Sequence, residues 1–160
     1  MQKHTMSLLV DNEPGVLARV SGLFSGRGFN IESLCVAETL EPTVSRITLV
    51  TRGDDAVAEQ ITKQLNKLIN VIKVTDLTAT ERVEREMALI KVSAKADFRA
   101  EILRIVDIFR CKVIDVSSTH YTVEVTGTAD KLAAILRLLR PMGIKEVART
   151  GAIALAREKK

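Results

Sequence analysis

Aromatic side chains are scarce in this chain of 160 residues: they make up 3% of it, with no tryptophan and a single tyrosine. RNA-recognition modules stack bases on exposed aromatic side chains of a sheet. Phe24, Phe98 and Phe109 fit inward positions of expected helices, so too few aromatic residues remain for such a surface. The composition therefore argues against a nucleic-acid partner.

Histidine and cysteine are equally rare, with two residues of each. His4 lies in an N-terminal segment that we expect to be frayed, and His120 at a predicted hairpin tip, so a nucleophilic triad is poorly supported. Cys35 and Cys111 are far apart in apolar runs and form no metal-binding pattern, which favours buried free thiols. The sequence also lacks a Walker loop and a GxGxxG turn between strand and helix. We expect no catalytic residue and no metal site.

Long apolar runs are missing as well. No run approaches the length that spans a membrane, and residues 1–6 lack the apolar core of a signal peptide. With 46% hydrophobic residues, 28% charged residues and a net charge of +4, the composition is typical of a soluble globular protein, and we expect a cytoplasmic one without a membrane partner. The basic tail 157–160 is either a solvated end or a contact for an acidic partner.

Hydrophobic periodicity predicts the same order of elements twice: strand, helix, strand, strand, helix, strand. In the first copy, the apolar residues at 16, 20, 23 and 24 recur at helical spacing. The expected first-copy elements are strand 5–10, helix 15–25, strands 29–36 and 44–51, a helix from 54–55 to 68, and strand 71–77. The expected second-copy elements are strand 87–94, a helix from 97 to 109, strands 112–116 and 121–126, a helix from 128 to 139, and a strand through 147 with 152–155 as its candidate extension.

This order predicts an α+β fold of two tandem ferredoxin-like βαββαβ domains, each with two helices on one face of a four-stranded antiparallel sheet. We place the first domain at 1–78, a linker at 79–86 and the second domain at 87–160. The other face of each sheet is left to water, the sister unit or another chain. Leu34 and Val36 are expected to share this outer face with Asn30 and Glu32.

The segment from Asn12 to Leu17 is the strongest candidate for a binding site. A helix start carries N–H groups without intrahelical partners, which attract an anion, and Gly15 lets a ligand approach the main chain. On local chemistry alone, a capped helix without a ligand remains open. The second copy has Lys95-Ala96-Asp97-Phe98 at the corresponding place, so only the first copy is expected to bind.

Four separated segments resemble the small regulatory subunits of acetolactate synthase. They match, in order, the family's patterns N-E-x-G-x-L-x-R-V, L-F-x-x-R-G-[YF]-N-I-E-S-L, V-E-R-E and E-V-x-R-[TS]-G. The matching segments are residues 12–20, 23–34, 83–86 and 146–151. The first two alone would indicate only a generic amino-acid-binding ACT domain.

The resemblance implies an N-terminal ACT domain and a C-terminal domain of related topology in a chain without a catalytic site of its own. Such subunits bind and activate the catalytic large subunit, a transferase of valine, leucine and isoleucine biosynthesis, and confer feedback inhibition, commonly by valine. The implied cofactors, thiamine diphosphate, Mg²⁺ and FAD, belong to that partner, and this chain holds none.

The resemblance also implies a homodimer in which ACT domains pair edge to edge and bind the effector at their interface. Asn12 and Gly15 then come from one chain and Asn30 from its partner. The N–H groups of Val16 and Leu17 can receive the carboxylate of a free amino acid, and Asn amides can accept from its ammonium. We expect the apolar side chain of the effector near Leu17 and Ile31.

Two other classes of function remain as alternatives. A stand-alone amino-acid sensor, such as an ACT-type transcriptional regulator, would need a helix-turn-helix that the sequence does not reveal. A small ferredoxin-like enzyme would need a convergent acid, base or nucleophile set, which is also not found. The sequence leaves valine, leucine and isoleucine open as effectors.

Overall fold

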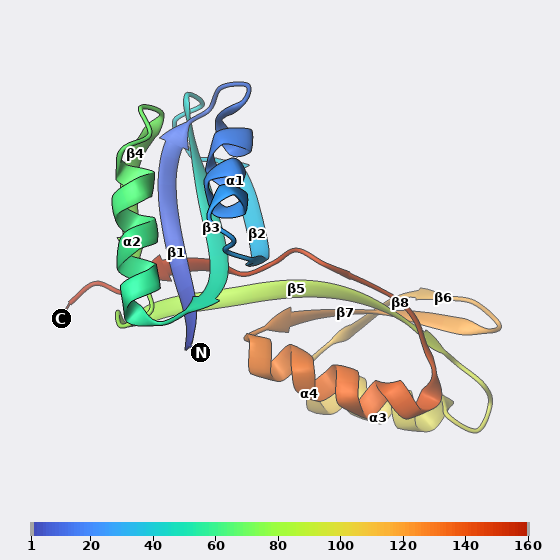
Figure 1. Cartoon of the computed structure of the whole chain (residues 1–160). Coiled ribbons are helices and arrows are strands. Elements are labelled where there is room, and N and C mark those ends of the chain that lie inside the picture. The colour runs from blue at the N-terminus through green and yellow to red at the C-terminus, as the bar shows by residue number, and fades with distance from the viewer. Residues whose placement is uncertain (1, 160) are drawn as a thin grey trace. The chain divides into compact units, whose positions relative to one another are not determined.

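The chain forms two compact units in this computed structural model, which describes residues 2–159. The first unit runs to Val83 and also contains the C-terminal residues from Gly151 onward, and the second comprises Glu84–Thr150. Both units have the order strand, helix, strand, strand, helix, strand, which confirms the predicted fold class (Figure 1). The residues after Gly151 thus lie with the first unit, although the expected second domain, 87–160, includes them.

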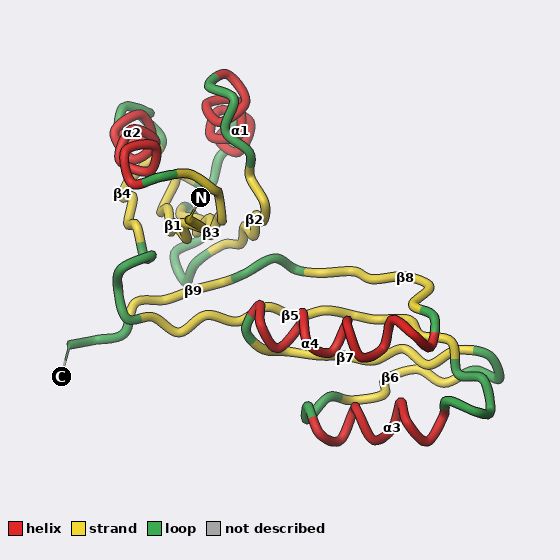
Figure 2. The backbone as a smooth tube through the Cα atoms, turned by 60° about the horizontal axis from the view of Figure 1, so that its bottom comes forward, coloured by secondary structure: helices red, strands yellow, loops and turns green. Residues whose placement is uncertain are grey.

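The first unit is a four-stranded antiparallel sheet in the order β2-β3-β1-β4. Helices α1 and α2 lie on the same face of this sheet, as Figure 2 shows. The elements are β1 (Gln2–Asp11), α1 (Val16–Gly26), β2 (Ile31–Glu38), β3 (Val44–Gly53), α2 (Asp55–Asn66) and β4 (Val71–Asp76).

The core of the first unit lies between the helices and the two central strands. Alternate residues of β1 and β3 point to the helices, as the twofold period of a strand requires. The helices contribute residues at spacings of three and four, as the 3.6-residue period predicts. The fully buried side chains include Met6, Leu8, Phe24, Ile47, Leu49, Ile61 and Leu65.

The face of this sheet away from the helices is partly covered by the C-terminal strand β9 (Ile153–Ala156), as Figures 1 and 2 show. The N–H group of Ala152 donates to Ser33 Oγ on β2 at 3.1 Å. After β9, the N–H group of Arg157 donates to the carbonyl of Glu81 at 2.8 Å. Residues 152–155, a candidate extension of the strand before them, form a separate strand, β9, that pairs with β5 as β8 does, and the compact first unit includes this strand.

A bulge in β2 changes which side chains face the core. Ile31 lies opposite Thr51 and Ser33 opposite Val50, so the two-residue step from Ile31 to Ser33 meets a single step on β3. Leu34 then lies opposite Leu49 and packs against the core beneath the helices. The expectation that Leu34 and Val36 lie on the outer face is therefore wrong.

His4 is also placed differently from the frayed terminus that we expected. It lies in β1 and is 2% exposed. Its Nδ1 atom is 3.3 Å from Thr78 Oγ1 and 3.6 Å from an oxygen of Asp76. Pairing of β1 with both β3 and β4 brings these residues together, which no local pattern in the sequence reveals.

The second unit repeats the arrangement, with strand order β6-β7-β5-β8. Helices α3 and α4 supply buried residues at helical spacing, among them Ile102, Ile105, Leu132, Ile135 and Leu139. The elements are β5 (Arg82–Ser93), α3 (Arg99–Ile108), β6 (Lys112–Val116), β7 (His120–Gly127), α4 (Ala129–Leu139), a 3₁₀ turn (Arg140–Met142) and β8 (Ile144–Arg149). Strand β5 begins inside the expected linker, 79–86. No helix in the described part of the chain is long and apolar enough to span a membrane.

An ion pair joins the first and last strands of the second unit. Arg149 Nε donates to Glu86 Oε1 at 2.7 Å, and its Nη2 donates to Oε2 at 3.2 Å. Two parallel charge-assisted bonds of this kind fix the geometry of both side chains. Glu86 ends the V-E-R-E motif and Arg149 lies in the E-V-x-R motif, so two segments that carry the family resemblance meet here.

Gly151 allows the chain to enter the segment that leads to β9. Its φ is +82°, and an added Cβ would lie 3.2 Å from both Leu34 O and Ser33 Oγ. We predict that Gly151→Ala lowers the free energy of unfolding of the first unit by about 1–2 kcal/mol, the cost of a left-handed non-glycine residue. Denaturant unfolding measures this change, and hydrogen exchange should show faster exchange at Ala152 and Ala154.

Gly22→Ala is the matched control, because Gly22 lies within α1 and an added Cβ meets no atom within 4 Å. It should raise stability by up to about 1 kcal/mol through helix propensity. Equal stability of Gly151→Ala and the wild type would contradict the role given to Gly151.

Candidate functional site

The loop between β1 and α1 is fixed to the far end of the β2–β3 hairpin. Asn12 Nδ2 donates to Glu38 Oε1 at 3.1 Å and to the carbonyl of Pro42 at 2.9 Å. The N–H group of Asn12 donates to the carbonyl of Thr43 at 2.8 Å. Both donors of the amide side chain are therefore in use, while its oxygen remains available as an acceptor.

Gly15 is the residue from which α1 starts. Its φ is +84°, in the left-handed region, and an added Cβ would meet no atom within 4 Å. The space beside its main chain is therefore open. The positive φ, and not a lack of space for a side chain, is what favours glycine at position 15.

The N-terminus of α1 is left without a cap from its own side chains. Gly15 offers none, and the first turn contains no acidic residue. The N–H group of Val16 makes a long contact of 3.4 Å with the carbonyl of Glu13, while that of Leu17 has no acceptor among the described residues. In α2, by contrast, Asp54 accepts from Val57 N–H at 2.9 Å. The start of α1 therefore offers a partial positive charge to an external anion.

The two apolar residues at this helix start have different surroundings. Val16 is buried in the core beneath α1, so only its main chain can face a ligand. Leu17 is 43% exposed on the outer side of the helix. Leu17 can therefore offer both an N–H group and an apolar contact.

Asn30 and Ile31 lie at the opposite end of the sheet. The carbonyl of Asn30 accepts from Thr51 Oγ1 at 2.7 Å, and its side chain is exposed. Ile31 begins β2 and packs partly against the core. Because β2 has eight residues, at about 3.3 Å each, about 25 Å separates its two ends. Within one chain, the six predicted site residues therefore form two separate groups.

Two residues that support the loop were missed by the sequence analysis, namely Glu38 and Asn70. Asn70 Nδ2 donates to Asp11 Oδ2 at 3.2 Å, and Asn70 Oδ1 accepts from Arg19 Nη1 at 2.5 Å. Asn70 thus ties the end of β1 to helix α1. It lies more than fifty residues from either partner in the sequence, so no local signal could have identified it.

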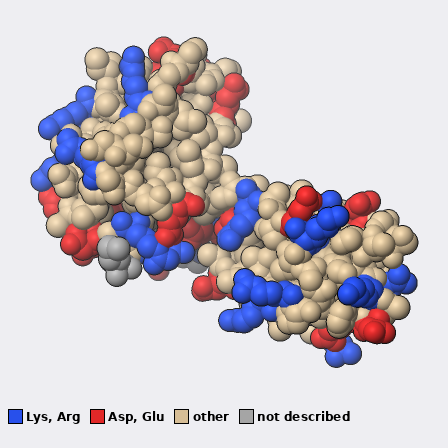
Figure 3. Space-filling view, turned by 45° about the vertical axis from the view of Figure 1, so that its right-hand side comes forward, with Lys and Arg blue, Asp and Glu red and all other residues tan. Residues whose placement is uncertain are grey.

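Other chemistry has little support in the described part of the chain. No group of three or more His, Cys, Asp or Glu side chains there is placed to hold a metal ion. Cys35 and Cys111 are free and half-buried, and burial raises the pKa of the Cys111 thiol. On the face shown in Figure 3, basic and acidic side chains are interspersed and form no continuous basic surface.

The fold and the loop together define the class of protein. Two helices lie on one face of a four-stranded antiparallel sheet, and a glycine loop precedes the first helix, as expected for an ACT domain. Residues 6–73 match the family model described as the AHAS small subunit-like ACT domain, and residues 85–158 match the model for the small subunit of acetolactate synthase. The chain belongs to the acetolactate synthase small-subunit family.

Individual relatives agree with this assignment. The chain is 54% identical over 154 residues to the acetolactate synthase small subunit of Mycolicibacterium smegmatis, covering 96% of this chain and 91% of that protein. It is 53% identical over 158 residues to the probable acetolactate synthase small subunit of Archaeoglobus fulgidus, covering 99% of both. The crystal structure of the small subunit from Thermotoga maritima superposes with a TM-score of 0.91 at 45% identity, covering 100% of both chains. The family resemblance of the four motifs is confirmed.

Removal of the Asn12 amide should loosen the loop. We predict that Asn12→Ala lowers the free energy of unfolding by about 1 kcal/mol, because two exposed hydrogen bonds to Glu38 and Pro42 are lost. Amide exchange at residues 12–15 should become faster. As a control, Asn66→Ala at the exposed end of α2 should change stability by less than about 0.5 kcal/mol. Indistinguishable exchange rates in the two variants would mean that Asn12 does not hold the loop.

Proposed function

We propose that this chain is a non-catalytic regulatory subunit. It binds the catalytic large subunit of acetolactate synthase in the cytoplasm and activates it. It also makes the complex sensitive to a branched-chain amino acid, with valine as the first candidate. Family membership supports the partner, and the placement of the two groups of site residues supports the effector.

The observation that carries the effector site is the position of β2 at an edge of the sheet. In a homodimer, the two β2 strands pair antiparallel about a twofold axis, so that the start of one strand lies beside the end of the other. Asn12 is hydrogen-bonded to Glu38 at the end of β2. One chain's loop therefore meets the partner's Asn30, and the dimer contains two equivalent sites.

The chemistry of this composite site suits a free amino acid. Its carboxylate faces the N–H groups at the start of α1, where Gly15 leaves open space. Its ammonium group donates hydrogen bonds to the side-chain oxygen of Asn12 and to that of the partner's Asn30. Its apolar side chain lies against Leu17 and the partner's Ile31. Thiamine diphosphate, Mg²⁺ and FAD belong to the catalytic subunit, and this chain supplies no cofactor.

Inhibition follows from a difference in effector affinity between two states of the complex. A ligand shifts such an equilibrium only to the extent that it binds one state more tightly. We infer that the effector changes the geometry of the ACT dimer and thereby favours an inactive state of the catalytic subunit. Equal effector affinity for the free subunit and for the activated complex would contradict this mechanism.

The direct experiment measures acetolactate formation by the cognate catalytic subunit, with and without this chain, while valine is titrated. We expect strong activation by this chain and reversal of that activation by valine. Activation that leucine or isoleucine reverses, but valine does not, would retain the subunit and correct the effector. The absence of both activation and a complex would overturn the proposal in favour of a stand-alone amino-acid sensor.

Substitution of Gly15 tests the effector site. Gly15→Asp should raise the valine concentration for half-inhibition at least tenfold, which corresponds to about 1.4 kcal/mol, because the new carboxylate occupies the open space and repels that of the effector. Gly15→Asn is the matched control, since asparagine has nearly the same size, no charge, and tolerates a positive φ. It should have a smaller effect. A normal valine response of the Asp variant would show that the effector binds elsewhere.

A further inference from the structure

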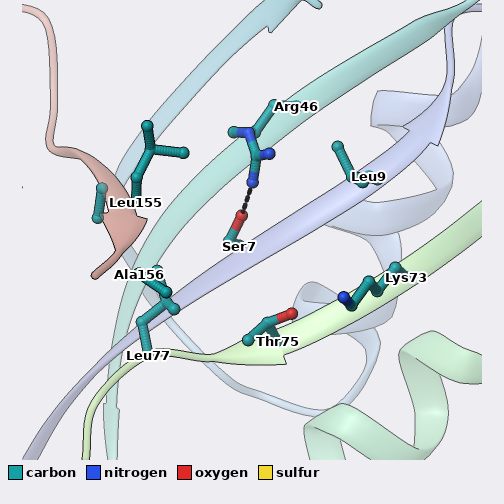
Figure 4. A pocket seen from close by; sticks show the side chains of 9 residues that line it. Ser7, Leu9, Arg46, Lys73, Thr75, Leu77, Leu155 and Ala156 are labelled. Atoms are coloured by element: carbon teal, nitrogen blue, oxygen red, sulfur yellow. Dashed lines mark hydrogen bonds between the residues drawn. The ribbon is translucent and has the colours of Figure 1, made fainter. Parts of the chain in front are cut away.

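A cavity lies in the first unit, on the face of the sheet away from the helices. It has a volume of about 210 Å³ and lies between strands β1, β3 and β4 and the C-terminal strand β9. Figure 4 shows the side chains that line it. This cavity is separate from the loop that starts α1, and it forms within a single chain.

The register of the strands brings two basic side chains to this cavity. Leu9 of β1 lies opposite Arg46 of β3 on one side and opposite Lys73 of β4 on the other. Neighbouring strands are about 4.8 Å apart, so about 10 Å separates the two basic residues at the main chain. Both side chains are long enough to reach one small group between them.

Hydroxyl groups lie in the next row of the same face. Ser7 lies opposite Thr75, two residues along each strand from the basic row. Ser7 is only 5% exposed, and its Oγ accepts from Arg46 Nη1 at 2.6 Å (Figure 4). The hydrogen of the Ser7 hydroxyl and the remaining guanidinium donors are thus available to a further acceptor.

The positive charge of the cavity is not compensated by the chain. None of the lining residues is acidic, and no ion pair of Arg46 or Lys73 is found among residues 2–159. Arg52 has the same orientation on β3 as Arg46, but it is paired with Glu32. Two uncompensated cations beside a buried hydroxyl favour an anion as the missing partner.

We propose that this cavity binds a small organic anion. Its carboxylate or phosphate group lies between Arg46 and Lys73 and accepts from the hydroxyls of Ser7 and Thr75. Its apolar part lies against Leu9 and Leu155. The volume supports a molecule larger than a single ion, because one water occupies only about 30 Å³ in the liquid.

The position of β9 gives this binding a structural consequence. Leu155 and Ala156 form one wall of the cavity, while β1, β3 and β4 form its floor. A bound anion therefore contacts β9 and the sheet together and holds β9 in place. The anion should slow amide exchange in residues 154–156.

The test is an NMR titration of the full chain with three probes at constant ionic strength: isobutyrate, its neutral isostere isobutyramide, and inorganic phosphate. We expect saturable shifts of the amide signals of Arg46, Lys73 and residues 154–156 with isobutyrate but not with isobutyramide. If phosphate produces the same shifts as isobutyrate, the cavity recognises the negative charge alone. If isobutyrate produces the shifts and phosphate does not, the cavity recognises an aliphatic carboxylate. Equal shifts with isobutyramide, or no saturable shift with either anion, would overturn the proposal.

Variants separate this cavity from general charge effects. Arg46→Met and Lys73→Met should each weaken isobutyrate or phosphate binding at least tenfold. Arg52→Met is the matched control, because it removes one positive charge from the same face of β3 outside the cavity, and it should keep the affinity of the wild type. Lys73 is exposed at an edge strand, so its variant is expected to fold, and the amide spectrum verifies this. Unchanged affinity in both cavity variants would contradict the site.

The same variants distinguish this inference from the proposed effector site. Arg46 and Lys73 take no part in the loop that starts α1, so activation of the catalytic subunit and its valine response should persist in variants that lose the anion. If the folded Lys73→Met variant lost the valine response, the cavity would be part of the effector site. That result would overturn the proposal of a separate anion site.

Discussion

The packing of α1 and α2 on the two central strands is the contact on which the first unit depends. Met6 and Leu8 of β1 and Ile47 and Leu49 of β3 are fully buried beneath the helices. Because β1 pairs with both β3 and β4, and β3 also pairs with β2, the pairing of the strands gives the order β2-β3-β1-β4. It therefore holds the loop at 12–15 at one end of the sheet and Asn30 at the other. Because these two groups lie at opposite ends of the sheet, a single site that contains both would need two chains.

The elements themselves were predictable because their signals are local. Helices α1, α2, α3 and α4 each bury residues spaced three or four apart, and the strands alternate with a period of two. For Leu34, however, the period of two predicts the wrong face of the sheet. A bulge between Ile31 and Ser33 shifts the alternation by one residue, and the bulge is defined by pairing with β3 rather than by the composition of β2.

Residues of the family motifs also have structural roles that the sequence patterns alone do not reveal. Glu86 and Arg149 form a bidentate ion pair between β5 and β8, although more than sixty residues separate them. Gly151 combines a positive φ with a close approach to β2. Gly15 has a similar φ but open space around it, so the two glycines serve different purposes: one permits close packing and the other leaves room for a ligand.

The sequence by itself determined the repeat, the helix and strand periods, the α1 loop and the family, because these depend on residues that are neighbours along the chain. Only the tertiary structure decided that β9 partly covers the first sheet, that His4 is buried, and that Asn70 supports the loop before α1. It also placed Arg46, Lys73 and Ser7 around one cavity. These contacts join residues far apart in sequence, and strand register, which no local pattern contains, brings them together.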